Sequence, residues 1–109
     1  MVQFSDLDTT FAALSDPTRR GILERLARGP ATISDLAEAF EMTLTGIKKH
    51  VGLLEAAGMV MTEKRGRVRY CRLGSNALDA EIAWMRSYRT VVESRLDHLG
   101  KFLERTEKD

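Results

Sequence analysis

Residues 32–73 consist of five consecutive segments: TISDLAEAF (32–40), EMT (41–43), LTGIKKHVGLLEAA (44–57), G (58) and MVMTEKRGRVRYCRL (59–73). Thr32 and Thr43 each precede a block with helical spacing of apolar residues, and their hydroxyls can cap a helix N-terminus. Gly58 suits the left-handed position that ends a helix. Gly66 lies between two short runs rich in bulky residues, which predicts a hairpin turn. The stretch therefore predicts a helix, a three-residue turn, a second helix and an arginine-rich hairpin.

Helices are also predicted on both sides of this stretch. A short amphipathic helix is expected over residues 6–14. Asp16 and Pro17 provide a cap and a first helical residue for a second helix that reaches about Arg28. Ser75 or Asn76 is expected to open a last helix to about residue 105. This order predicts a mostly α winged helix-turn-helix, with about five helices and a two-stranded wing.

The last helix has more apolar surface than one small domain can bury. Its apolar residues recur at near-heptad spacing, which is typical of a helix–helix seam. We expect the first and last helices, over 1–14 and 76–105, to form a homodimer around a single domain of residues 1–109, whose DNA-binding part is 32–73. The expected dimer contacts are Leu7, Phe11, Ile82, Met85, Val92, Leu96, Leu99 and Leu103.

Composition narrows the class of protein. The chain has 109 residues, one cysteine and a net charge of +1. It has no apolar run long enough to span a bilayer, and its first residues do not have the pattern of a signal peptide. We therefore expect a cytoplasmic protein without membrane contact. Residues 44–73 contain seven Lys and Arg against two Glu, a net charge of +5, so the rest of the chain carries −4. Charge is concentrated where a winged helix contacts DNA.

Double-stranded DNA is therefore the expected partner. The start of the helix expected over residues 44–57 combines a helix dipole, hydroxyls and lysines, which suit contacts with base edges and phosphates. The arginines of the hairpin suit contacts with phosphates or the minor groove. The plainer alternatives are a solvated helix face and edge-strand protection by charge. The expected DNA contacts are Thr43, Thr45, Gly46, Lys48, Lys49, His50, Arg65, Arg67 and Arg69.

The sequence also resembles a known family over nearly its whole length. The matching segments are LSDPTRRGIL (14–23), KH (49–50), LLEAAGMV (53–60), GRVRYCRL (66–73) and a long C-terminal helix. They resemble the arsenic-repressor (ArsR/SmtB) family of bacterial winged-helix regulators. The resemblance implies a cytoplasmic homodimer that represses a promoter, often its own. With two recognition helices, such a dimer is expected to bind a palindromic operator.

One departure from that family concerns metal sensing. Metal-sensing members carry a Cys-x-Cys motif where this chain has Thr32 and Ser34, whose hydroxyls are poor ligands for soft metals. We therefore expect no metal site of this type and no cofactor. Two switched alternatives stay open: a metal held between subunits by His98 with Glu93 or Asp97, or a redox-active Cys71.

A third alternative is a winged helix that binds protein instead of DNA. The basic residues of the helix expected over 44–57 argue against this alternative. No pairing of nucleophile and base, carboxylate dyad or phosphate-binding glycine loop is present in the required context, so no catalytic residue and no enzyme are expected. The identity of an effector does not follow from the sequence.

Overall fold

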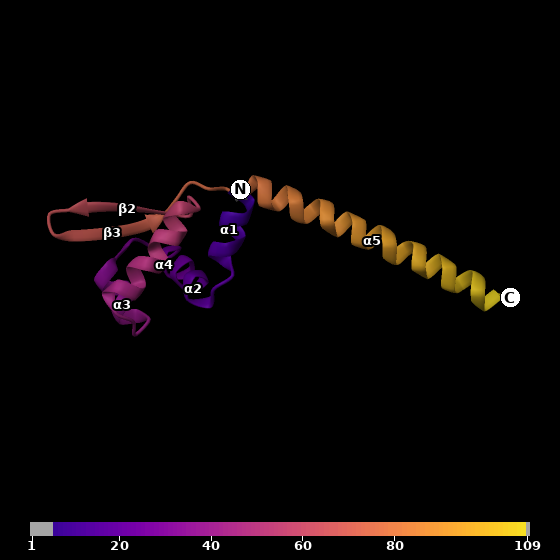
Figure 1. Ribbon diagram of the computed structural model, residues 1–109, viewed down its shortest axis with the longest axis horizontal. Helices are drawn as coiled ribbons and strands as arrows, with labels where there is room; N and C mark the ends of the chain where they lie inside the picture. The colour runs from indigo at the N-terminus through magenta and orange to yellow at the C-terminus, as the bar shows by residue number, and fades with distance from the viewer. Residues whose placement is uncertain (1–5, 109) are drawn as a thin grey trace, which may run out of the picture. The chain divides into compact units, whose positions relative to one another are not determined.

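The computed structural model describes residues 6–108, with side chains to Thr106. Its contacts divide the chain into one compact unit that ends at Ala77 and another that begins at Leu78. The elements, labelled in Figure 1, are α1 (Asp6–Leu14), α2 (Pro17–Leu26), β1 (Ala31–Thr32), α3 (Ile33–Ala39), α4 (Leu44–Ala56), β2 (Val60–Arg65), β3 (Val68–Leu73) and α5 (Asp79–Lys108).

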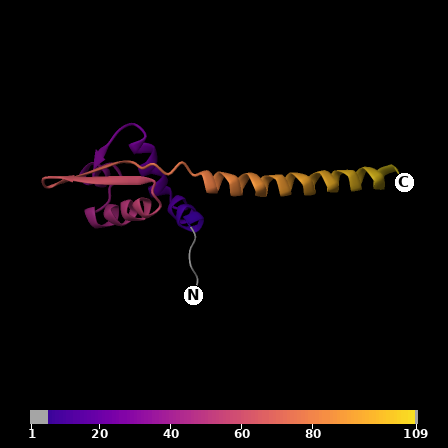
Figure 2. The ribbon, with the colours of Figure 1, turned by 90° about the horizontal axis from the view of Figure 1, so that it is seen from above.

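The predicted winged helix-turn-helix is confirmed, and α4 is central to its first unit. This helix contacts α1, α2, α3 and β2. Its residues Ile47, Val51 and Leu54 are buried, as are Ile22 of α2 and Leu36 of α3. In Figures 1 and 2 the turn between β2 and β3 lies beyond the ends of α3 and α4, as a wing does.

The sheet has one strand more than predicted. Its order is β1-β3-β2, all antiparallel, with Ala31 opposite Cys71 and Thr32 opposite Tyr70. The expected two-stranded wing is present as the hairpin of β2 and β3, and β1 adds a third strand to the sheet on the other side of β3. A strand of two residues shows no alternation of polar and apolar side chains, and only its pairing with β3 defines it.

The predicted helix caps are present. The Asp16 carboxylate accepts from the Arg19 N–H at 3.0 Å, and this bond holds the pKa of Asp16 below its ordinary value. Thr32 and Asp35 form a reciprocal capping box, in which the Thr32 N–H lowers the pKa of Asp35. Thr43 accepts from the Gly46 N–H at 3.0 Å. These local bonds fix where α2, α3 and α4 begin.

The predicted start of the last helix was wrong. Asn76 donates its side-chain amide to the Ala57 carbonyl at 2.7 Å and its N–H to the Gly58 carbonyl at 3.2 Å, so it caps the end of α4 instead of opening α5. Gly74 lies so close to this turn that a Cβ on it would overlap the Gly58 carbonyl. Leu78 then adopts φ of 61°, outside the helical region, and α5 begins at Asp79.

α5 is a helix of 30 residues that makes up most of the second unit. Trp84 and Tyr88 stack one turn apart with their ring centroids 5.6 Å apart, and Arg89 pairs with Glu93 at 2.8 Å. Nearly all of its large apolar side chains are exposed in the single chain. No helix within residues 6–108 combines the length and apolar character needed to cross a membrane.

Candidate nucleic-acid interface

The start of α4 presents a polar face opposite its buried one. Thr43, Thr45, Lys48 and Lys49 are exposed, whereas Gly46 is half-buried and gives its N–H to the Thr43 hydroxyl. The helical period produces this division, because Ile47, Val51 and Leu54 occupy the inward stripe. Both lysines and both threonine hydroxyls are thus available at the solvent face of this helix.

The register of the wing places its charged residues on two faces. Lys64 lies opposite Arg69, two positions from the pair of Thr62 with the buried Cys71. Side chains alternate along a strand, so Lys64 and Arg69 share the face that carries Cys71. Arg69 donates to the Thr62 hydroxyl at 3.1 Å, and Thr62 donates to Glu55 of α4 at 3.1 Å. This chain of bonds ties the wing to α4.

Arg65 occupies the other face of the wing. Its guanidinium pairs with Glu63 at 3.2 Å and lies over the Tyr70 ring at 5.6 Å from the centroid. These two partners hold Arg65 along the strand. Arg67 belongs to the two-residue turn with Gly66, where its side chain is exposed. The three predicted wing arginines therefore occupy three different environments.

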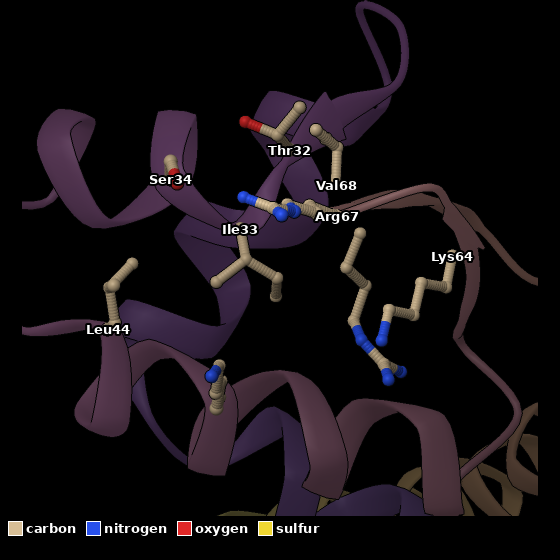
Figure 3. A pocket seen from close by; sticks show the side chains of 9 residues that line it. Thr32, Ile33, Ser34, Leu44, Lys64, Arg67 and Val68 are labelled. Atoms are coloured by element: carbon tan, nitrogen blue, oxygen red, sulfur yellow. The ribbon is translucent and has the colours of Figure 1, made fainter.

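A cavity of about 310 Å³ lies where α3, α4 and the wing meet. Figure 3 shows Thr32 and Ser34 on one side of it and Lys64 on the other, with Arg67 extending from the wing toward the start of α3. We call it the wing pocket. It is lined by Thr32, Ile33, Ser34, Leu44, Lys48, Lys64, Arg67, Val68 and Arg69. Three of the predicted DNA contacts are thus brought together.

His50 faces into the domain. Its Nδ1 lies 3.1 Å from Nη1 of Arg19 and 3.9 Å from the Asp16 carboxylate, both on α2 or its cap. The ring is half-buried. The predicted DNA contact of His50 is not supported at Nδ1, which has a partner inside the protein. Charge and position in α4 alone could not separate this internal role from an external one.

Comparison with known proteins identifies the family. A helix-turn-helix domain model matches residues 14–63. The transcriptional repressor SdpR of Bacillus subtilis is 34% identical over 82 residues, which cover 75% of this chain and 91% of that protein. A crystal structure of an ArsR family transcriptional regulator is 44% identical, covers 86% of this chain and 98% of that one, and gives a TM-score of 0.75. This chain belongs to the ArsR family.

A further structural neighbour of this ArsR family regulator bears on its fold. It is the homodimeric winged helix-turn-helix DNA-binding domain of a possible ArsR-family regulator from Mycobacterium bovis, at 24% identity. It covers 90% of this chain and 95% of that one, with a TM-score of 0.63, and at that identity it supports the fold alone. The family consists of transcriptional regulators and not of enzymes.

The two predicted switches, a redox-active Cys71 and a metal site, can be compared with the structure. Cys71 is fully buried in β3, and burial raises the pKa of its thiol to about 11. Cys71 is therefore a small residue of the core and not an accessible thiol. Among the described residues, no three His, Cys, Asp or Glu side chains come together as one metal site within a chain. A metal site between two subunits stays a prediction.

The sequence interpretation missed three polar members of the wing pocket in this ArsR family regulator. Lys64, Thr32 and Ser34 were not among the expected DNA contacts, yet they line the same cavity as Lys48, Arg67 and Arg69. Strand alternation could have placed Lys64 on the face of Cys71. The approach of α3 to the wing could not be predicted, because it depends on the pairing of β1 with β3.

Proposed function

We propose that this protein is a cytoplasmic, dimeric repressor that binds a palindromic DNA operator. The single observation that carries the proposal is the meeting of the polar face of α4 with the basic wing around one cavity. Helix α4 would enter the major groove, and Lys49 with the threonines at its start would contact base edges or phosphates. Arg67 would contact the backbone and position the wing.

Dimerisation supports this geometry. Exposed apolar side chains continue along α5 from Trp84 to Leu103, more than a soluble monomer ordinarily leaves open. A relative with the same fold is described as homodimeric. A twofold dimer would place two α4 helices about 34 Å apart, the spacing of successive major grooves on one side of DNA. Occupation of a promoter by such a dimer would exclude RNA polymerase.

The test is fluorescence anisotropy on the DNA upstream of the protein's own coding region, beside a scrambled duplex, across several salt concentrations. We expect tighter binding to the upstream DNA and a steep loss of affinity with salt. Lys49→Ala should reduce the preference for that DNA, because it removes a contact at the groove. Arg67→Ala should weaken both duplexes alike and lower the salt slope by about one.

Lys101→Ala is the matched control, since it removes one exposed positive charge from α5. It should leave both affinities unchanged. Equal binding of both duplexes by all variants would contradict the assigned interface. A complex with protein that ignores salt and needs no DNA would instead favour an interaction module.

A further inference from the structure

The wing pocket combines positive charges from separate elements. Lys48 comes from α4, Lys64 from β2, Arg67 from the hairpin turn and Arg69 from β3. None of the nine residues that line it, all in the described part of the chain, is acidic. Four like charges around one cavity repel each other, so a bound anion would relieve an existing electrostatic cost. An ordinary solvated face spreads such charges apart.

The pocket is also lined by two hydroxyl groups. The Thr32 oxygen accepts from the Asp35 N–H at 2.9 Å, and the Thr32 hydroxyl also hydrogen-bonds the Asp35 carboxylate within the same capping box. Ser34 adds a second hydroxyl from the same wall (Figure 3). Arg69 uses Nη1 for Thr62, and its remaining N–H groups are not used by that bond. Hydroxyls and guanidinium groups together match the several oxygens of a phosphate.

The apolar lining and the size of the cavity limit which ligands it can hold. Ile33 of α3 is buried at the edge of the cavity, and Leu44 adds an apolar side chain that is about half exposed. The volume of about 310 Å³ equals that of roughly ten water molecules at about 30 Å³ each. One phosphate with its first waters, or two linked phosphates, fits this space.

We infer that the wing pocket is a binding site for a phosphate-type oxyanion. The inference deepens the proposed function, because this site lies on the face proposed for DNA. Two sources share the chemistry: one backbone phosphate of the DNA, and a free phosphorylated small molecule. Ser34 and Lys64 are binding residues in either case.

The site can be tested directly with pyrophosphate. It is titrated into the protein in a calorimeter, without DNA and at constant ionic strength. We expect saturable binding that Lys64→Gln weakens roughly tenfold, the effect of losing one charged hydrogen bond. Arg72→Gln is the matched control, because it removes one positive charge from the wing outside the pocket. It should leave the affinity unchanged.

Ser34→Ala separates a built site from general attraction, since it alters no charge. We expect it to weaken pyrophosphate binding roughly two- to tenfold. The inference is overturned if pyrophosphate shows no saturable binding. It is also overturned if Arg72→Gln costs as much as Lys64→Gln, or if Ser34→Ala has no effect in a protein whose circular dichroism is unchanged.

DNA duplexes with single methylphosphonate substitutions distinguish the two sources. If a backbone phosphate occupies the pocket, one substitution will weaken binding by the wild type but not by Lys64→Gln, and pyrophosphate will compete with DNA. If the ligand is a free molecule, pyrophosphate will bind to the protein, but neither the methylphosphonate substitution nor Lys64→Gln will alter the affinity for DNA. Pyrophosphate binding without any operator binding would refute the proposed function and leave this site standing.

Discussion

Cys71 is the single thiol of the chain, and its surroundings are those of a core residue. Desolvation by burial is the main cause that raises its pKa to about 11, with a smaller effect of the Glu55 charge in the same direction. At pH 8 the thiolate fraction is therefore about one in a thousand. Since the thiolate is the reactive form, the native protein should resist oxidation and alkylation at this residue.

We expect iodoacetamide at pH 8 to label native Cys71 slowly and urea-unfolded Cys71 at the rate of a free thiol. Mass spectrometry over time measures both. A Cys71→Ser, Ser94→Cys protein is the control, because Ser94 is exposed on α5 and its replacement thiol should react quickly without urea. Fast labelling of Cys71 in the folded protein would revive the redox-switch interpretation.

Among the elements, α1, α2 and α4 are joined by one side chain. Arg19 of α2 donates through Nε to the Ala13 carbonyl at 2.8 Å and through Nη2 to the Ala12 carbonyl at 3.0 Å, at the end of α1. Its Nη1 faces His50 Nδ1 of α4 at 3.1 Å. The contact is a hydrogen bond when Nδ1 is the unprotonated ring nitrogen. The helix proposed to enter DNA is thus fixed against a helix proposed to dimerise.

A double-mutant cycle of Arg19→Ala and His50→Ala, followed by urea unfolding, measures this link. We expect a coupling free energy of about 1 kcal/mol, the usual contribution of one partly buried hydrogen bond. Arg20→Ala with His50→Ala is the control cycle. Arg20 donates to the Leu14 carbonyl at 2.7 Å, so its effect should add to that of His50→Ala without coupling.

Should both cycles prove additive, the Arg19–His50 contact would contribute nothing to stability. The anisotropy assay on the same variants then asks whether it positions α4 on DNA. A larger loss in Arg19→Ala than in Arg20→Ala is expected there, because only Arg19 contacts α4.

At the scale of the whole molecule, the exposed apolar face of α5 calls for a partner. The predicted seam residues Met85, Val92, Leu96, Leu99 and Leu103 are all exposed in one chain, between 36% and 61%. Ile82, Leu7 and Phe11 are half-buried. Their contribution to a dimer stays a prediction. A second copy of α5 would bury this face by the heptad packing that the spacing predicts.

Leu96→Glu should shift the protein from dimer to monomer in analytical ultracentrifugation, because it places a charge within the seam. Operator affinity should fall with it by a factor of 100 or more, on the order expected when two linked binding events become one. Lys101→Glu, on the opposite side of the helix, should change neither. A dimer that survives Leu96→Glu unchanged would place the interface elsewhere.

Local chemistry in the sequence determined most of the elements. Asp16, Thr32 and Thr43 each bond a backbone N–H three residues ahead, so a short segment is sufficient to start α2, α3 and α4. Gly66 similarly fixes the hairpin turn, with φ of 64°. The charged face of α4 followed from side-chain periodicity.

Only the tertiary structure decided what lies between those elements. The pairing of Ala31 with Cys71 creates β1, and the bonds of Asn76 with the end of α4 delay α5 to Asp79. The inward position of His50 and the meeting of Ser34 with Lys64 around one pocket depend on residues far apart in sequence. Such contacts leave no periodic signal, because the packing of the whole unit, and not the conformation of any one segment, determines them.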